Sequence, residues 1–285
     1  MSQTLFVTGA SIGIGRTASL LFHERGWNVI ATMRSPEKES ELTRIPNVLV
    51  TRADVTDEKS VAAAAKKGID TFGQIDVLLN NAGYGAYGPI EATPMDDVRK
   101  EFDTNVIGML AAIKAIVPHF RQRGKGMIVN ISSVGGRVAF PLGSLYHGSK
   151  FAVEGVTEAL QFEMAAIGVT VKLVEPGQTR TNFAGRSFQF NDDEHLTEYR
   201  DVVGKTMAAF ETLGKDAAEP QSVAETIYRA ATDGTTQLRY VSGRDADDLL
   251  QSRKREDDET FTRRIRKLFG LEHETEPVSA RHDHA

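Results

Sequence analysis

The chain has 285 residues, of which 40% are hydrophobic and 25 are glycine, a composition typical of globular proteins. It contains no cysteine, which excludes disulfides, thiolate metal sites and cysteine nucleophiles. The 34 basic and 39 acidic residues give a net charge of −5, which argues against nucleic acid or an anionic membrane as the partner and favours a small molecule.

The longest uncharged run covers residues 1–15, which is too short to span a membrane and lacks the features of a secretory signal. We therefore expect a cytoplasmic protein with no membrane partner. No metal site is predicted, and two histidines near the end of the chain, His282 and His284, are interpreted as incidental.

Short runs of β-branched residues alternate with longer helical stretches, which is typical of βαβ units and a parallel sheet. Seven strands are predicted, at Leu5–Thr8, Val29–Thr32, Val48–Thr51, Val77–Leu79, Met127–Ile131, Val169–Val174 and Leu238–Val241. Helices are predicted at Gly13–Gly26, Glu58–Phe72, Pro94–Gln122, Ser144–Ala166 and Gln221–Ala231. Asp57 and Thr93 precede two of these helices and are expected to cap them. The pattern predicts one doubly wound α/β domain over residues 1–243, the Rossmann architecture, with a mostly seven-stranded parallel sheet.

Two segments depart from this alternation. Residues 180–215 lack a clear period and carry aromatic side chains among polar ones. Because they follow the carboxyl end of the sixth predicted strand, where open α/β sheets bind ligands, we predict a lid over a substrate pocket. Residues 244–270 hold fifteen charges with apolar residues at helical spacing, so we predict amphipathic helices that dock on the body or on a partner subunit. Residues 271–285 are interpreted as a disordered tail.

A glycine-rich loop, Thr8-Gly9-Ala10-Ser11-Ile12-Gly13-Ile14-Gly15, follows the first predicted strand. Glycine lets the backbone approach a pyrophosphate, whose charge is met by the amides at the positive end of the next helix. Three residues separate the first two glycines, where the commonest dinucleotide fingerprint has one. In this spacing the chain resembles the classical short-chain dehydrogenase/reductases, whose motif is T-G-x-x-x-G-x-G. The resemblance implies that Gly9 and residues 11–15 of the loop bind a nicotinamide dinucleotide.

The end of the second predicted strand, Ala31-Thr32-Met33-Arg34-Ser35, indicates which dinucleotide is used. It carries no carboxylate to hydrogen-bond the free 2′-hydroxyl of NAD. Arg34 can instead pair with a 2′-phosphate, and Ser35 can donate a hydrogen bond to it. We therefore predict NADP(H) as the cofactor, with NAD(H) as the alternative.

The resemblance covers residues 4–243 and implies further cofactor contacts. Asp54 and Val55 correspond to the family residues that meet the adenine amino group. Asn80-Asn81-Ala82-Gly83 matches the family's N-N-A-G motif, which supports the sheet and runs past the adenosine ribose of the cofactor. The segment Pro176-Gly177-Gln178-Thr179-Arg180-Thr181 matches the family's P-G segment, whose backbone and threonines position the nicotinamide carboxamide.

Tyr146 and Lys150 lie four residues apart in a predicted helix and therefore share one face. Lowering the pKa of a phenol from about 10 to near neutrality requires about 4 kcal/mol. A cation about 4 Å away supplies about that much at an effective dielectric near 20. We therefore predict that Tyr146 is the general acid/base and that Lys150 activates it. Ser133, thirteen residues before Tyr146, is expected to hold the substrate oxygen by a hydrogen bond as its charge changes.

Further roles at this site rest on the resemblance. In the family the lysine also bonds the nicotinamide ribose, and an asparagine of the preceding long helix, here Asn105, anchors a water chain to that lysine. The resemblance also implies a homodimer or homotetramer packed through the two long helices at Pro94–Gln122 and Ser144–Ala166. His147, which points off the face shared by the tyrosine and the lysine, is interpreted as incidental.

These residues together predict an NADP(H)-dependent oxidoreductase that interconverts a carbonyl and a secondary alcohol by hydride transfer. The predicted pocket walls, Tyr84–Pro89, Arg137–Leu145 and the lid, are rich in aromatic and aliphatic side chains, which favours a substrate with an apolar body. Two alternatives remain open. The protein could be an NAD-dependent alcohol dehydrogenase of the same family, or a non-catalytic regulatory protein that binds NADP(H).

Overall fold

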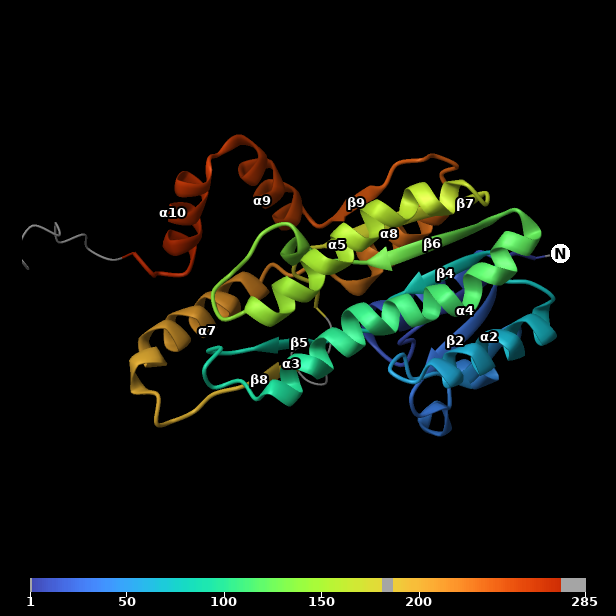
Figure 1. The fold of residues 1–285 in the computed structure, drawn as a ribbon, viewed down its shortest axis with the longest axis horizontal. Coiled ribbons are helices and arrows are strands. Elements are labelled where there is room, and N and C mark those ends of the chain that lie inside the picture. The colour runs from blue at the N-terminus through green and yellow to red at the C-terminus, as the bar shows by residue number, and fades with distance from the viewer. Residues whose placement is uncertain (1, 181–186, 273–285) are drawn as a thin grey trace, which may run out of the picture.

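The computed structural model describes residues 2–180 and 187–272 (Figure 1). The cofactor contact predicted for Thr181 and the tail beyond residue 272 lie outside the described residues. None of the described helices is long and apolar enough to cross a bilayer.

A seven-stranded sheet, parallel throughout, forms the centre of the fold. Its spatial order is β3-β2-β1-β4-β6-β7-β9, so the direction of winding reverses between β1 and β4. This order confirms the predicted doubly wound sheet, and it places the switch point, where such sheets bind ligands, at the end of β1. The strands are β1 (Thr4–Val7), β2 (Asn28–Met33), β3 (Val48–Arg52), β4 (Val77–Asn80), β6 (Gly126–Ile131), β7 (Val169–Pro176) and β9 (Arg239–Ser242).

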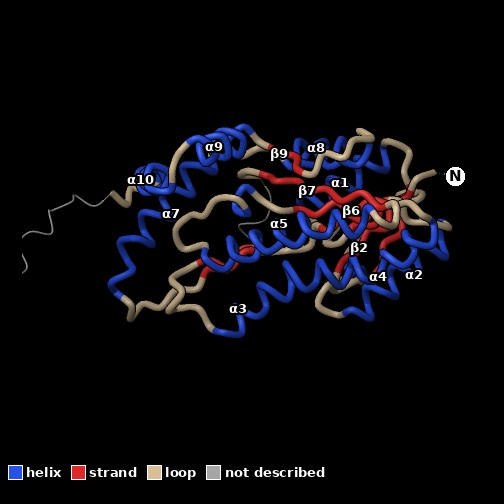
Figure 2. Tube along the Cα trace, turned by 45° about the horizontal axis from the view of Figure 1, so that its top comes forward, coloured by secondary structure: helices blue, strands red, loops and turns tan. Residues whose placement is uncertain are grey.

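Helices cover both faces of the sheet (Figure 2). On β1, Leu5 and Val7 pack into one core with α1 (Gly13–Glu24) and α8 (Pro220–Thr232). Phe6, which points to the opposite face because strand side chains alternate, packs into a second core. That second core is built with the helices α2 (Glu58–Phe72), α4 (Gly108–Arg123) and α5 (Ser144–Ala165).

The helix predicted at Pro94–Gln122 is continuous but has three parts. It begins as α3 (Met95–Phe102), passes through a π-helical turn over Asp103–Ile107, and continues as α4. The predicted cap by Thr93 is wrong, because Pro94 occupies the cap position and the Thr93 hydroxyl donates to the carbonyl of Pro89 instead. The predicted cap by Asp57 is confirmed, since its carboxylate accepts from the Ser60 amide at 3.2 Å.

The predicted lid is more regular than its sequence indicates. It contains β8 (Phe188–Phe190) and a fifteen-residue helix, α7 (Arg200–Gly214). β8 pairs in parallel with β5 (Gly85–Tyr87), a strand that the sequence analysis did not predict. Three residues are too few to show a strand period, and α7 buries only one of its own residues, Thr206, so its period is weak as well.

The charged segment after β9 forms the two predicted amphipathic helices, α9 (Arg244–Arg255) and α10 (Asp258–Leu268). Their apolar faces pack on the body of the same chain, beside the loop that follows β6 and beside α7.

Candidate active site

A cavity of about 1530 Å³ lies at the carboxyl ends of the strands. Its walls are the segments that follow β1, β2, β3, β4, β6 and β7, together with the start of α5. It thereby brings together residues that the sequence spreads over about 210 positions. The predicted site residues that line it are Gly9, Ser11, Ile12, Gly13, Ile14, Arg34, Ser35, Asp54, Val55, Asn81, Ala82, Gly83, Ser133, Tyr146, Lys150, Pro176, Gly177 and Thr179.

The glycine loop presents unsatisfied amides to this cavity. Helix α1 begins at Gly13 with no acidic residue in its first turn, and its N-cap residue, Ile12, offers no capping side chain. The first amides of the helix are therefore available to an external anion, as the pyrophosphate of a dinucleotide requires. Gly9 has a left-handed φ of +70°, which favours glycine.

Gly15 does not line the cavity. A Cβ at Gly15 would lie 2.4 Å from both the Asn81 side-chain amide and the Gly9 carbonyl oxygen. Glycine is therefore needed here for close packing of the loop. The partner in that packing is well fixed, because Asn81 Nδ2 donates to the carbonyls of Thr8 and Gly9 at 3.1 and 3.0 Å.

Two cations stand at the end of the cavity formed by the segment after β2. Arg34 lines it, as predicted, and is exposed. Lys38 lines it too, at the end of a short 3₁₀ turn over Pro36–Lys38, and was missed because it lies beyond the strand end where the cofactor-reading residue is expected. Arg16, which follows the glycine loop, is instead paired with Glu39 at 2.6 Å. Arg34 and Lys38 thus supply the positive charge of this end.

Ser133, Tyr146 and Lys150 converge at the other end. The Ser133 hydroxyl is hydrogen-bonded to the Tyr146 phenol. The Lys150 ammonium lies 5.9 Å from the centre of the Tyr146 ring and donates to the carbonyl of Ile131 at 3.0 Å. The tyrosine and the lysine share one face of α5, so the segment that follows β6 contacts the tyrosine through Ser133 and the lysine through Ile131.

The prediction that the pKa of Tyr146 is lowered is wrong for the protein without a bound cofactor. Burial raises the pKa of Tyr146 to about 12, the bond from Ser133 opposes this only in part, and the charge of Glu101 adds to it. Burial also lowers the pKa of Lys150 to about 8, although Glu101 and Glu154 favour its charged form. The sequence argument counted the attraction of a nearby cation but not the cost of removing the phenolate from water.

Asn105 lies beside this group without lining the cavity. Its Oδ1 accepts from the Tyr84 amide at 3.0 Å, and its Nδ2 donates to the Tyr84 carbonyl at 2.8 Å and to Ser149 at 3.0 Å. A Cβ added to Gly83 would lie 2.9 Å from Asn105 Oδ1 and 3.8 Å from Lys150 Nζ, so glycine lets these groups approach. Asn105 therefore fixes the segment after β4 against the start of α5.

Glu101 is a functional candidate that sequence reasoning missed. It is 0% exposed and lies one helical turn before Asn105, whose Nδ2 donates to Glu101 Oε1 at 2.8 Å. Glu101 Oε2 accepts from the Ala86 amide in β5 at 2.9 Å, and the Ser149 hydroxyl donates to Oε1 at 3.3 Å. Burial raises the pKa of Glu101 to about 7, against the opposing effects of the Ala86 bond and of Lys150. The sequence signal that could have identified Glu101 is its position four residues before Asn105 in the same predicted helix.

The prediction that His147 is incidental is wrong, because its ring has a structural role. It is buried, its Nε2 accepts from the Phe140 amide at 3.0 Å, and its Nδ1 lies 2.9 Å from the carbonyl oxygen of Gly135. Because Nε2 is the acceptor, Nδ1 carries the proton and donates to Gly135. Burial lowers the pKa of His147, which keeps the ring neutral. The ring therefore holds the 135–140 loop against α5.

The remaining wall of the cavity is aromatic. Tyr87 of β5 lies with its ring centre 5.5 Å from that of Tyr146, 5.2 Å from Phe188 and 5.7 Å from Phe210. The predicted lid thus reaches the group around Tyr146 through β8 and α7. The aromatic and aliphatic side chains of this wall are Tyr84, Tyr87, Phe140, Phe188, Met207 and Phe210.

The chain is similar to known short-chain dehydrogenases. The model of the short chain dehydrogenase family matches residues 3–192, which include every predicted site residue. An uncharacterized oxidoreductase of Schizosaccharomyces pombe is 45% identical over 244 residues, which are 84% of this chain and all of that protein.

Two solved structures are similar over most of their length. A short-chain dehydrogenase from Streptomyces avermitilis has a TM-score of 0.80 at 32% identity, covering 95% of this chain and 97% of that one. A short-chain dehydrogenase from Burkholderia cenocepacia, solved in complex with NADP, has a TM-score of 0.74 at 26% identity, covering 93% of this chain and 97% of that one.

Proposed function

The chain belongs to the classical short-chain dehydrogenase/reductase family, and from that premise we propose that it is an NADP(H)-dependent oxidoreductase that interconverts a carbonyl and a secondary alcohol. One observation carries the proposal, the convergence of Ser133, Tyr146 and Lys150 in the same cavity as the glycine loop. Binding a dinucleotide does not by itself need a tyrosine hydrogen-bonded to a serine, so this group favours turnover over binding alone.

The residues that would hold the cofactor fit a dinucleotide with an additional phosphate. The open amides of α1 suit its pyrophosphate, and Arg34 and Lys38 suit a 2′-phosphate. The family resemblance implies that Lys150 also bonds the nicotinamide ribose. When bound, the reduced nicotinamide supplies the hydride.

The chain's own groups then provide orientation and a proton. In the direction of carbonyl reduction, Ser133 holds the substrate oxygen by a hydrogen bond, which gains strength as negative charge develops on that oxygen. Tyr146 keeps its proton at neutral pH because burial raises its pKa to about 12. It is therefore an acid that can protonate an alkoxide, and the Lys150 ammonium stabilises the phenolate that remains.

The substrate side of the cavity favours a molecule with an apolar body. Its walls carry Tyr84, Tyr87, Phe140, Phe188, Met207 and Phe210, which offer apolar area to such a body. We infer that Ser133 and Tyr146 supply the polar contacts to the reacting oxygen.

The proposal is tested by following NADPH absorbance with a panel of ketones and aldehydes, with NADH in parallel. Turnover that prefers NADPH, and that falls by 10²-fold or more in Tyr146→Phe, supports it. Tyr199→Phe is the matched control, because Tyr199 is bonded to Glu91 and does not line the cavity. Preference for NADH would favour the NAD-dependent alternative. Binding of NADPH without turnover in either direction would favour the non-catalytic alternative.

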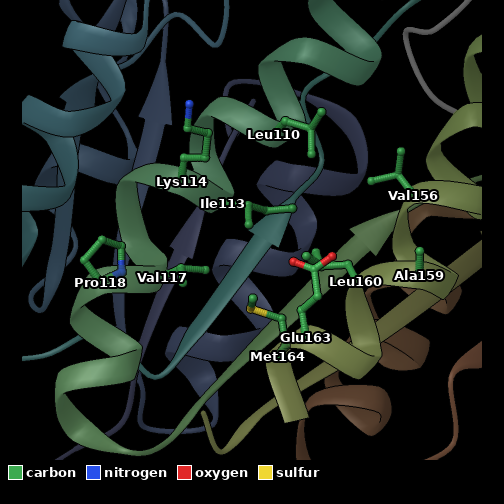
Figure 3. Close-up of a pocket in the computed structure, with 10 residues that line it drawn as sticks. All are labelled: Leu110, Ile113, Lys114, Val117, Pro118, Val156, Ala159, Leu160, Glu163 and Met164. Atoms are coloured by element: carbon green, nitrogen blue, oxygen red, sulfur yellow. The ribbon is translucent and has the colours of Figure 1, made fainter. Parts of the chain in front are cut away.

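We further propose that the protein is a homodimer or homotetramer that packs through α4 and α5. A groove of about 540 Å³ runs between these helices on the surface (Figure 3). The walls of the groove are mostly aliphatic, with Lys114 and Glu163 as the charged members. Phe162, which precedes Glu163 in α5, is 74% exposed. A charged residue of each sign lets the same face of a second copy offer a complementary partner.

A further inference from the structure

The helices α9 and α10 follow the last strand of the sheet and lie beyond residues 3–192, the part matched by the family model. They stand on the side of the molecule where α7 lies (Figures 1 and 2). Their buried apolar side chains form one cluster with Val134 and Val138 of the loop after β6, and Phe140, Phe210 and Leu213 pack against it. The extension is therefore in contact with two cavity-lining segments.

Phe269, which follows α10, packs against two aromatic residues of the cavity wall. It is 1% exposed, and its ring centre lies 5.6 Å from that of Phe140 and 5.4 Å from that of Phe210. Phe140 and Phe210 both line the cavity, whereas Phe269 does not. One side chain from the carboxyl-terminal extension thus supports both of these wall residues.

Both supported residues connect to the group around Tyr146. Phe140 donates its amide to His147 and packs edge-on against that ring at 5.2 Å. Phe210 packs edge-on against Tyr87 at 5.7 Å, and Tyr87 lies 5.5 Å from Tyr146. A shift of either phenylalanine would therefore change the space next to the reacting position.

The support matters because α7 has little other packing. Thr206 is the only residue within α7 that is buried. Three apolar side chains of α7 pack on the cluster that contains Phe269, namely those of Ala209, Phe210 and Leu213. Helices of this kind are held in place by the partner that covers their apolar face. The extension is that partner.

We propose that the carboxyl-terminal extension sets the size of the substrate site, with Phe269 as a specificity-determining residue that holds Phe140 and Phe210 in the cavity wall. The inference rests on the proposed function and adds to it. It assigns the substrates as carbonyl compounds whose apolar body ends against this wall. Removing the Phe269 ring lets the wall residues move outward, which lengthens the site.

A series of methyl ketones with alkyl chains of increasing length tests this proposal. We expect Phe269→Ala to raise KM about 10-fold for the ketone that the unaltered enzyme prefers, to change kcat by less than threefold, and to move the optimum to longer chains. Leu268→Ala is the matched control, because Leu268 is the preceding residue of α10 and is 40% exposed. The same chain-length profile in both variants would overturn the proposal.

A second measurement does not depend on turnover. Hydrogen exchange in residues 200–214 and 134–140 should be faster in Phe269→Ala than in Leu268→Ala, because both segments lose their support. If the unaltered protein reduces no carbonyl compound, the proposed function fails. Equal exchange rates in Phe269→Ala and Leu268→Ala would, independently of turnover, overturn the role of Phe269 in supporting the cavity wall. Phe269→Leu, which keeps most of the apolar contact, replaces Phe269→Ala if that variant does not fold, and a smaller shift in the same direction is expected.

Discussion

Lys150 lies one helical turn after Tyr146, and its ammonium is 5.9 Å from the centre of the phenol ring while it donates to the carbonyl of Ile131. The role proposed for the lysine is to act on the Tyr146 phenolate through its charge, in a region where burial lowers the pKa of Lys150 to about 8. The proposed acid of the reaction depends on a cation whose charge is itself sensitive to pH.

We expect kcat/KM for carbonyl reduction to fall as the pH rises through about 8, because Lys150 then loses the charge that stabilises the Tyr146 phenolate. In Lys150→Arg the cation persists, so the activity that remains should fall only at higher pH. Lys125→Arg, on the surface, should leave the profile unchanged. A fall at the same pH in Lys150→Arg and the unaltered enzyme would contradict this assignment.

Arg34→Ala should weaken NADPH binding by 10- to 100-fold and leave NADH binding nearly unchanged, since only NADPH carries the 2′-phosphate. Lys38→Ala should have a smaller effect in the same direction, because a lysine makes one point contact where arginine can make two bonds. Fluorescence titration at fixed ionic strength measures both constants. Arg44→Ala is the control, as Arg44 is exposed and does not line the cavity. Equal losses for the two cofactors would remove the basis for the NADP assignment.

Glu101 should make stability depend on pH. Its pKa is raised to about 7 in the folded protein, from an ordinary value of 4.5. The folded state therefore favours the protonated form, and this contribution is complete below about pH 4.5 and lost as the pH rises through 7. We expect the unaltered protein to lose up to about 3 kcal/mol of unfolding free energy relative to Glu101→Gln between pH 5 and pH 8.

Urea unfolding at several pH values in this range measures that difference. Glu225 is an exposed carboxylate on α8. The difference in unfolding free energy between the unaltered protein and Glu225→Gln should therefore not change with pH. Parallel stability curves for the unaltered protein and Glu101→Gln would show that Glu101 does not titrate in this range.

The pair of Lys172 and Asp233 should be important for stability. The Lys172 side chain is fully buried, and its Nζ donates to Asp233 at 2.6 Å and to the Tyr240 hydroxyl at 2.9 Å. Asp233→Ala leaves that ammonium buried without its counter-charge, so we expect a loss of about 3 kcal/mol in chemical denaturation. Asp70→Ala, which removes an exposed pair with Lys66, should cost less than about 0.5 kcal/mol. Similar losses in both variants would contradict the expectation.

Ala159→Glu should reduce the proposed assembly to a monomer in light scattering, because Ala159 is exposed and lines the groove between α4 and α5. Each subunit of a symmetric dimer would then bring the same new charge to the interface. Ala63→Glu, an exposed position of α2, should keep the mass of the unaltered protein. A monomeric mass for the unaltered protein would refute the proposed assembly.

The sequence by itself determined the parallel sheet, the placement of the glycine loop and the pairing of Tyr146 with Lys150. These features depend on local patterns: a strand period of two, the spacing of glycines next to a strand, and a spacing of four residues on one face of a helix. The prediction for Arg34 rests on a rule of the same kind, its position at a strand end. Local rules suffice there because backbone geometry fixes which neighbours in sequence share a face or an edge.

Only the tertiary structure decided what surrounds those residues. β5 pairs with β8 about 100 positions away, Glu101 is buried by β5 and α5, and Phe269 reaches Phe140 and Phe210 from the end of the chain. The direction of the Tyr146 pKa was likewise beyond local reasoning. Desolvation depends on how many distant residues exclude water from a group, and that is fixed only when segments far apart in sequence pack together.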